Sequence, residues 1–196
     1  MPKQGFISAS KVGVILKNGK GQTFTVGAIT YAEEIAQQVI GVKPEPDFKS
    51  YDMERGIENE WLAIKTYEER ELVEVHSMQE WRTHPKFSYF GGTPDGLVGL
   101  IGGVDVKCPN NNNHFKNLMH DAQVKDYYDQ CQAYMAIFER DYWDLVSFNE
   151  NYPTPLDLHV MRIQKDMDWQ EKLTERLPLF WSLINEQVEI LKGKMI

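Results

Sequence analysis

Two acidic residues and a lysine stand close together in the stretch GGTPDGLVGLIGGVDVKCP, residues 91–109. Asp95 and Asp105 are ten residues apart, and Lys107 follows the second acid by two positions. If the glycine-rich segment between the acids reverses the chain, the two carboxylates come together and raise each other's pKa. A divalent cation such as Mg²⁺ relieves that repulsion. A lysine beside such a metal can position or deprotonate a water, so the pattern favours hydrolysis of a phosphodiester.

The strand that ends this stretch must place its charged and apolar side chains on opposite faces. Residues two apart point to the same face of a strand, so Asp105 and Lys107 project together while Val104 and Val106 face the other way and can bury. The segment GLIGG then allows a hairpin that brings Asp95 beside Asp105. The alternative is a surface hairpin with a cross-strand ion pair, because acid-x-Lys patterns are common on their own.

Helical and extended patterns alternate along the rest of the chain. Helices are expected before Gly41, over 52–69, over 121–138 and after Asp166, which is a plausible N-cap. Extended runs are expected over 71–82, 87–99, 102–109, 142–148 and 156–163. This order predicts an α/β fold, with a central mixed β-sheet flanked by helices. The length of 196 residues suits a single domain, residues 1–196.

Two local patterns lead to further expectations. Met53, Ile57, Trp61 and Ile64 recur at helical spacing and predict one buried stripe on the helix over 52–69. The run PNNNNHF, residues 109–115, directly follows the charged strand. Because asparagine favours turns, we expect a flexible loop there.

Composition limits the class of protein. The formal net charge of −8 argues against a broadly basic nucleic-acid binder, although a local basic path remains compatible with a DNA enzyme. No window approaches 18 uninterrupted apolar residues, so no transmembrane helix is expected. The start has no apolar core of signal-peptide length, and the two cysteines cannot build a disulfide framework. A cytoplasmic, reducing location is therefore expected.

Four segments in order resemble one family of nucleases. PDGLVGLIGGVDVKCP resembles the PD-(D/E)xK nuclease motif, and most closely the phage-type recombination exonucleases of the lambda exonuclease and YqaJ type. GFISASKVGVIL near the start is similar to that family's Ile-Thr-Ala-Ser segment. MERGIENEWLAIKTYEE is similar to its helix with a Glu-Asn pair, and YYDQCQAYM to its helix with Gln-x-Gln. The resemblance covers nearly the whole chain and implies a restriction-endonuclease-like nuclease core.

The resemblance implies roles for the residues of the charged hairpin. Asp95 and Asp105 are expected to bind the metal, with the Val106 carbonyl completing the shell of one ion. Position 105 carries Asp where lambda exonuclease has Glu, and the family accepts either acid. Lys107 is expected to hold or activate the attacking water. Glu58 is expected to serve a second Mg²⁺, so that two ions stabilise the attacking and leaving oxygens; Mn²⁺ is expected to substitute.

Glu58 has competitors on its own helix. Trp61 and Leu62, three and four residues further on, lie beside it, so Glu58 borders the apolar stripe and can point inward. Glu54 and Glu60 are the alternatives on the same acid-rich helix. We prefer Glu58 because it matches the family segment.

Further residues are implied to support the reaction or to bind DNA. Gln130 matches the first glutamine of the family's helix and is expected to support the catalytic centre, with Tyr127 nearby. Ser10 is expected to contact the 5′ phosphate of the DNA end, with Lys3 and Lys20 in place of family arginines. Serine and cationic side chains suit phosphate oxygens, although lysine lacks the bidentate fork of arginine.

The resemblance implies a Mg²⁺-dependent 5′→3′ exonuclease that digests one strand of linear double-stranded DNA to nucleotides and leaves a 3′ single strand. It also implies a ring-shaped homotrimer and a single-strand annealing protein as partner, for recombination by strand annealing. One alternative keeps the nuclease core but changes the substrate, as in a PD-(D/E)xK endonuclease or a RecB-like nuclease. Another alternative is a non-catalytic protein that binds DNA ends.

Overall fold

The computed structural model describes residues 3–43, 51–78 and 80–195, without the side chains of residues 51–58. The chain forms two compact units. The first unit combines Met1–Pro46, Trp81–Thr93 and Asp166–Ile196, and the second combines Asp47–Glu80 and Pro94–Lys165. Each unit is therefore assembled from segments that are far apart in the sequence.

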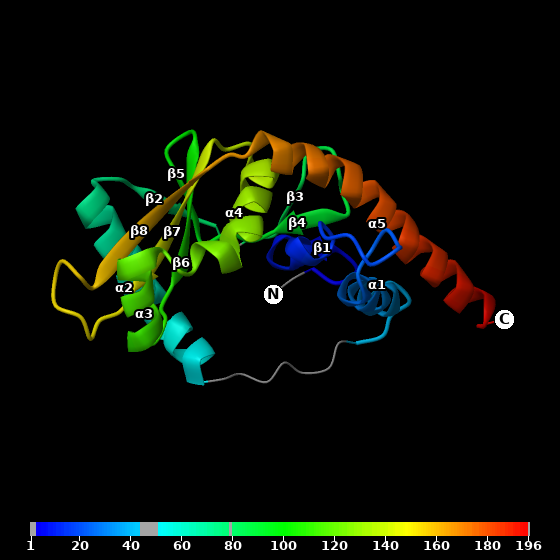
Figure 1. Ribbon diagram of the computed structural model, residues 1–196, viewed down its shortest axis with the longest axis horizontal. Coiled ribbons are helices and arrows are strands. Elements are labelled where there is room, and N and C mark those ends of the chain that lie inside the picture. Colours follow the sequence, from blue (N-terminus) through cyan, green and yellow to red (C-terminus); the bar gives the residue numbers. More distant parts are fainter. Residues whose placement is uncertain (1–2, 44–50, 79, 196) are drawn as a thin grey trace. The chain divides into compact units, whose positions relative to one another are not determined.

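The first unit has a small sheet and two helices that pack on each other (Figure 1). Its strands are β1 (Ile7–Ser8), β3 (Arg82–Thr83) and β4 (Phe90–Gly92), in the order β1-β4-β3, with β1 parallel and β3 antiparallel to β4. A short 3-10 helix, η1 (Ala9–Val14), follows β1, and the helices are α1 (Val26–Val39) and α5 (Met167–Gly193). The Asp166 carboxylate accepts a hydrogen bond of 3.1 Å from the Trp169 amide, which confirms the predicted N-cap of α5.

Arg176 of α5 holds the loop before α1 in place. Its buried guanidinium donates to the carbonyls of Ile15, Lys17 and Thr23 at 2.7–3.1 Å and to Asn18 Oδ1 at 2.9 Å. These acceptors, none of them a carboxylate, take up four of the five N–H donors of the guanidinium. Burial lowers the pKa of this guanidinium from its ordinary value. The helical pattern of α5 gave no sign of this contact.

The second unit contains the predicted mixed sheet. Its strand order is β2-β5-β6-β7-β8, with β6 and β7 parallel and the other neighbours antiparallel. The strands are β2 (Val75–Ser77), β5 (Gly96–Val98), β6 (Gly102–Lys107), β7 (Tyr142–Phe148) and β8 (Leu158–Gln164). The helices are α2 (Tyr51–Glu71), α3 (Asn111–His120) and α4 (Val124–Phe138). The predicted α/β class is confirmed, although β3 and β4 join the small sheet of the first unit.

The two faces of β6 carry different chemistry, as the strand pattern predicted. Val104 and Val106 are buried in a core with Ala63 and Tyr67 of α2. Asp105 points to the opposite face, where Gln130 of α4 approaches it. Because side chains alternate along a strand, one short segment can close the core on one side and present charges on the other.

The predicted buried stripe of α2 is wrong at Trp61, whose side chain is 65% exposed. Among the described side chains of this helix, Ala63 and Tyr67, four residues apart, are instead the fully buried ones. The small Ala63 lets the helix approach the sheet, and Tyr67 fixes its rotation through a hydrogen bond of 2.6 Å to Asp144 of β7. Met53 and Ile57 of the same predicted stripe lie outside the described side chains.

The predicted flexible loop over 109–115 is also wrong, because α3 begins at Asn111. The Asn110 side chain accepts a hydrogen bond of 3.0 Å from the Asn113 amide and caps the helix. His114 of this helix is fully buried, with Nδ1 2.8 Å from Ser147 Oγ and Nε2 2.8 Å from the Leu156 carbonyl. An asparagine run can thus begin a helix when the following residues find buried partners.

No helix in the described ranges has the length and the apolar composition needed to span a bilayer.

Replacement of Tyr67 by phenylalanine is expected to destabilise the protein by about 1–3 kcal/mol. The hydroxyl donates to Asp144, a fully buried carboxylate that also receives Arg162 Nε at 2.8 Å. Urea denaturation measures the change in free energy of unfolding. Tyr152→Phe is the matched control, because its hydroxyl donates at the surface to the Asn111 carbonyl. Equal effects of the two substitutions would contradict the prediction.

Acidification is expected to destabilise the fold through His114. Burial lowers the pKa of the His114 ring, and the charge of His159 lowers it further. The Leu156 carbonyl and Asp157 raise this pKa, but their effect is smaller. The unfolded ring titrates near pH ~6.5 and binds a proton more readily than the folded one. This stabilisation is therefore complete above the unfolded pKa and is lost as the pH falls through the folded pKa.

The measurement is the free energy of unfolding between pH 7.5 and 5 for the parent and for His114→Asn. The variant should be less stable at neutral pH, with a weaker dependence on pH. An unchanged slope would show that the acid sensitivity comes from other groups.

Candidate active site

The hairpin formed by β5 and β6 brings the two predicted acids together. Gly96 pairs with Val104 in antiparallel register, which places Asp95 across from Asp105. Asp95 Oδ2 accepts a hydrogen bond of 2.7 Å from the Val106 amide, and Lys107 Nζ lies 2.5 Å from Asp105 Oδ2. The predicted hairpin is therefore confirmed, and its three charged side chains form one cluster.

Burial and charge strongly perturb this cluster. Burial raises the pKa of the Asp95 carboxyl to about 7, with a further contribution from Asp105 and against the effects of Lys107 and the Val106 amide. Burial alone would lower the pKa of the Lys107 ammonium, but attraction to Asp105 and Asp95 raises it above its ordinary value. Two carboxylates thus share one cation in a desolvated site, which is typical of functional sites.

Residues of α4 complete the surroundings of Asp105. Gln130 Nε2 lies 3.5 Å from Asp105 Oδ1 and 3.2 Å from the Tyr134 hydroxyl. Lys107 Nζ lies 4.8 Å from the centre of the Tyr127 ring. The predicted residues Gln130 and Tyr127 therefore join the cluster, and Tyr134 is an additional member that orients Gln130.

The donor set of the cluster fits a hard divalent cation. Asp95 and Asp105 offer carboxylate oxygens, and their mutual repulsion falls when a cation lies between them. Mg²⁺ uses few protein carboxylates and keeps several waters, so it does not need a closed cage. Among the residues with described side chains, no three His, Cys, Asp or Glu side chains gather as a metal site. The pair Asp95 and Asp105 is the candidate, and the role of the Val106 carbonyl stays a prediction.

The acid predicted to bind a second metal ion, Glu58, belongs to α2. The side chain of Glu58 lies outside the described part of the chain, so its role stays a prediction. Glu60, two residues further on, carries a charge that raises the pKa of Asp95, so this part of α2 lies near the cluster. Glu60 was one of the two alternatives to Glu58 in the sequence analysis, and its charge affects Asp95.

The residues predicted to bind the 5′ phosphate belong to the first unit. Ser10 is exposed, and its hydroxyl lies 2.9 Å from that of Ser8. Lys3 is exposed with its ammonium 4.4 Å from the centre of the Phe6 ring. Lys20 is exposed in the loop that Arg176 holds. Their contact with DNA stays a prediction.

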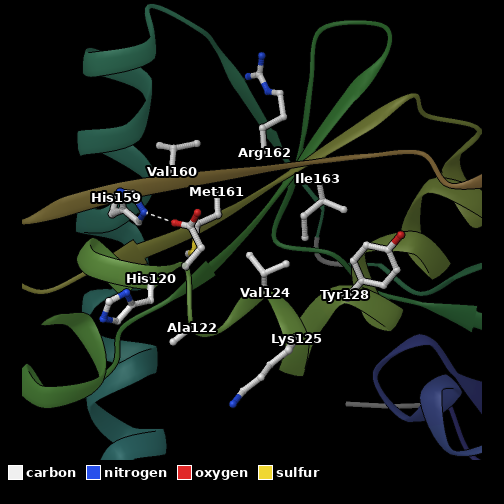
Figure 2. Close-up of a pocket in the computed structure, with 11 residues that line it drawn as sticks. His120, Ala122, Val124, Lys125, Tyr128, His159, Val160, Met161, Arg162 and Ile163 are labelled. Carbon is white, nitrogen blue, oxygen red and sulfur yellow. Dashed lines mark hydrogen bonds and ion pairs between the residues drawn. The ribbon is translucent and has the colours of Figure 1, made fainter. Parts of the chain in front are cut away.

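A groove of about 800 Å³ lies elsewhere in the second unit, along the edge strand β8. Figure 2 shows Tyr128 and His159 among its lining residues, with Arg162 directed to the other side of the strand. His159 Nε2 lies 2.6 Å from Asp121 Oδ1. None of the charged cluster lines this groove, so the two features are separate.

Comparison with known proteins identifies the family. Residues 2–141 match the sequence profile of the YqaJ-like viral recombinase domain, and the chain belongs to that family. Its fold is similar to that of an alkaline exonuclease, LHK-Exo, from Laribacter hongkongensis, at 26% sequence identity and a TM-score of 0.84. The similarity covers 97% of this chain and 93% of that one. LHK-Exo has also been solved in complex with dAMP.

A second solved structure shares the fold. A phage-related exonuclease from Haemophilus somnus 129PT is 18% identical, with a TM-score of 0.78 over 97% of this chain and 96% of that one. No curated protein sequence matches the chain. The family match and the shared fold confirm the resemblance drawn from the four sequence segments.

Addition of Mg²⁺ or Mn²⁺ is expected to raise the unfolding temperature if the two carboxylates bind the ion. A ligand at 100 times its dissociation constant contributes about 2.7 kcal/mol. Asp105→Asn should abolish the metal-dependent rise, whereas Glu186→Gln, on the exposed surface of α5, should keep it. Thermal unfolding with EDTA or with added metal measures the difference. The same rise in both variants would place the metal elsewhere.

Proposed function

We propose that this protein is a metal-dependent exonuclease that hydrolyses phosphodiester bonds of DNA. The observation that carries the proposal is the cluster of Asp95, Asp105 and Lys107 on the hairpin of β5 and β6. Membership of a viral recombinase family and the similarity to an alkaline exonuclease support it. The complex of that exonuclease with dAMP fits a reaction that releases deoxynucleoside monophosphates.

In the proposed reaction a water oxygen attacks the phosphorus that joins the first two nucleotides. The bond from that phosphorus to the 3′ oxygen of the first nucleotide breaks. In this step the water gives its OH to the phosphorus and one proton to the leaving oxygen, so the products are a nucleotide with a free 3′ hydroxyl and a shortened strand with a new 5′ phosphate. The Lys107 ammonium, paired with Asp105 at 2.5 Å, orients the water and offsets charge on the phosphate oxygens. Gln130 holds Asp105 from the other side at 3.5 Å.

Asp95 and Asp105 are the proposed ligands of Mg²⁺, with the Val106 carbonyl and Glu58 completing a two-ion site. When bound, the metal lowers the pKa of its water and stabilises the charge that develops at the phosphate. The Val106 amide holds Asp95 at 2.7 Å, so the carboxylate is oriented before metal arrives. Binding of the ion also removes the repulsion between the two acids.

The direction of digestion is proposed to be 5′→3′ on one strand of a linear duplex. Ser10, Lys3 and Lys20 are the proposed contacts of the 5′ phosphate, and their hydroxyl and ammonium groups suit phosphate oxygens. We further propose that residues 1–196 act as one nuclease domain in a homotrimeric ring in the cytoplasm. The proposed partner is a single-strand annealing protein that receives the 3′ strand for recombination.

The direct test uses linear duplex DNA labelled at one 5′ or one 3′ end, with Mg²⁺ or EDTA. The parent protein should release the 5′ label as mononucleotide, leave the 3′-labelled strand long and leave closed circular DNA intact. Lys107→Ala should slow digestion by about 100-fold or more, since loss of a group that stabilises transition-state charge has this size of effect. Lys125→Ala, an exposed lysine of α4 outside the cluster, is the matched control and should digest normally.

Other outcomes separate the alternatives. Nicking of the circle would indicate an endonuclease with the same core, and loss of the 3′ label first would reverse the proposed direction. Binding to DNA ends without cleavage, under either Mg²⁺ or Mn²⁺, would favour the non-catalytic alternative. Equal activity of the parent and Lys107→Ala would remove the cluster from the mechanism.

A further inference from the structure

Trp61 on α2 is a large aromatic side chain that the fold does not use for its core. Its side chain is 65% exposed, and the ammonium of Lys65, one helical turn further on, lies 4.7 Å from the centre of its ring. The cation and the ring attract each other and hold the indole in a defined position. An exposed tryptophan contributes little to the free energy of folding, because most of its apolar surface stays in water.

The exposure of Trp61 is a fixed property of the second unit. Ala63 and Tyr67 are fully buried against Val104 and Val106 of β6, in the same core cluster. The hydrogen bond from the Tyr67 hydroxyl to Asp144 prevents the helix from rotating to bury another face. The sheet therefore determines which side of α2 is open, and Trp61 lies on that side.

Trp61 also lies at the end of the sheet that carries the charged cluster. The neighbouring Asn59 donates a hydrogen bond of 3.3 Å to Glu150, just beyond the end of β7. β7 is parallel to β6, which ends at Lys107, so these strand ends are neighbours. Ala63, two residues after Trp61, packs in one core with Val104 and Val106 of β6, the strand that carries Asp105 and Lys107. A DNA strand held at the two acids would thus pass close to this part of α2.

We propose that Trp61 stacks on a base of the DNA strand held at Asp95 and Asp105, and that Lys65 contacts a phosphate of the same strand. This inference rests on the proposed nuclease function. Stacking on an aromatic ring accepts any base, which suits an enzyme that must advance through every sequence. The lysine supplies the positive charge that a nucleic-acid strand requires beside acidic residues such as Glu60.

A protein partner fits these observations less well than DNA does. A docking site for another protein has an apolar centre of some extent, whereas the ring of Trp61 is accompanied by Lys65 and Glu60. The nearest other large apolar side chain on this helix, Leu62, is 37% exposed. Adjacent aromatic and cationic side chains at the same end of the sheet as a candidate phosphodiester site fit a strand-binding path.

The test uses the Lys107→Ala protein, which keeps the substrate intact, with Mg²⁺ and a linear duplex carrying 2-aminopurine near its 5′ end. The fluorescent base is moved one nucleotide at a time along the digested strand. We expect binding to quench its fluorescence further at one or two adjacent positions. In the Lys107→Ala protein, the further substitution Trp61→Ala should remove this quenching and weaken DNA binding about 10-fold, since loss of one stacking ring has this size of effect. Trp61→Phe should retain part of both.

Leu100→Ala is the matched control, because Leu100 is a large apolar side chain with 90% exposure in the same unit. It lies in the turn between β5 and β6, at the other end of the hairpin from Asp95 and Asp105. This change should leave quenching and affinity unaltered.

Two results would overturn the inference. One is unchanged quenching and affinity in Trp61→Ala. The other is a changed sedimentation coefficient of the Trp61→Ala protein without DNA while its DNA binding stays the same, which would assign Trp61 to a contact between proteins. Failure of the nuclease proposal is distinguishable, because it shows in the parent protein, with Lys107 intact, as failure to digest the labelled duplex.

Discussion

The contact that the second unit depends on is the pairing of β5 with β6, because it sets two buried acids opposite each other. Repulsion between Asp95 and Asp105 is balanced by the Lys107 ammonium and by the Val106 amide. The same six-residue strand supplies Val104 and Val106 to the core under α2. Packing on one face thus fixes the backbone that presents the charges on the other. Burial of Val104 and Val106 offsets the free-energy cost of holding the two carboxylates close together.

The hairpin and its charges could be read from the sequence, because they depend on local spacing. Glycine between two acids, and alternation of Val104, Asp105, Val106 and Lys107, determine both the reversal and the faces. The positions of α1, α2, α4 and α5 followed for the same reason, since caps such as Asp166 and periodic apolar residues are local signals, whereas α3 was not predicted. The family resemblance added candidate partners for the acids that spacing alone did not provide.

Features that depend on contacts distant in sequence could not be predicted. Trp61 fits a helical stripe as well as Ala63 does. Packing of Ala63 and Tyr67 on the sheet, together with the hydrogen bond of Tyr67 to Asp144, 77 residues away, decides which face is buried. The asparagine run forms a helix because Asn110 caps it and the His114 ring contacts Ser147 and the Leu156 carbonyl, more than 30 residues further along the chain. The sequence of α5 indicates a surface position for Arg176, because the carbonyls that its guanidinium contacts lie more than 150 residues earlier in the chain.

The outer edge of β8 has a consequence for the behaviour of the protein in concentrated solution. In the described part of the chain this seven-residue strand pairs with β7 on one side alone, and open strand edges can recruit other chains into aggregates. Arg162, ion-paired with Asp144, and His159, paired with Asp121, place charged or ionisable groups on both faces of that strand. A second strand that paired with this edge would have to remove water from these groups. This desolvation cost opposes self-association through β8.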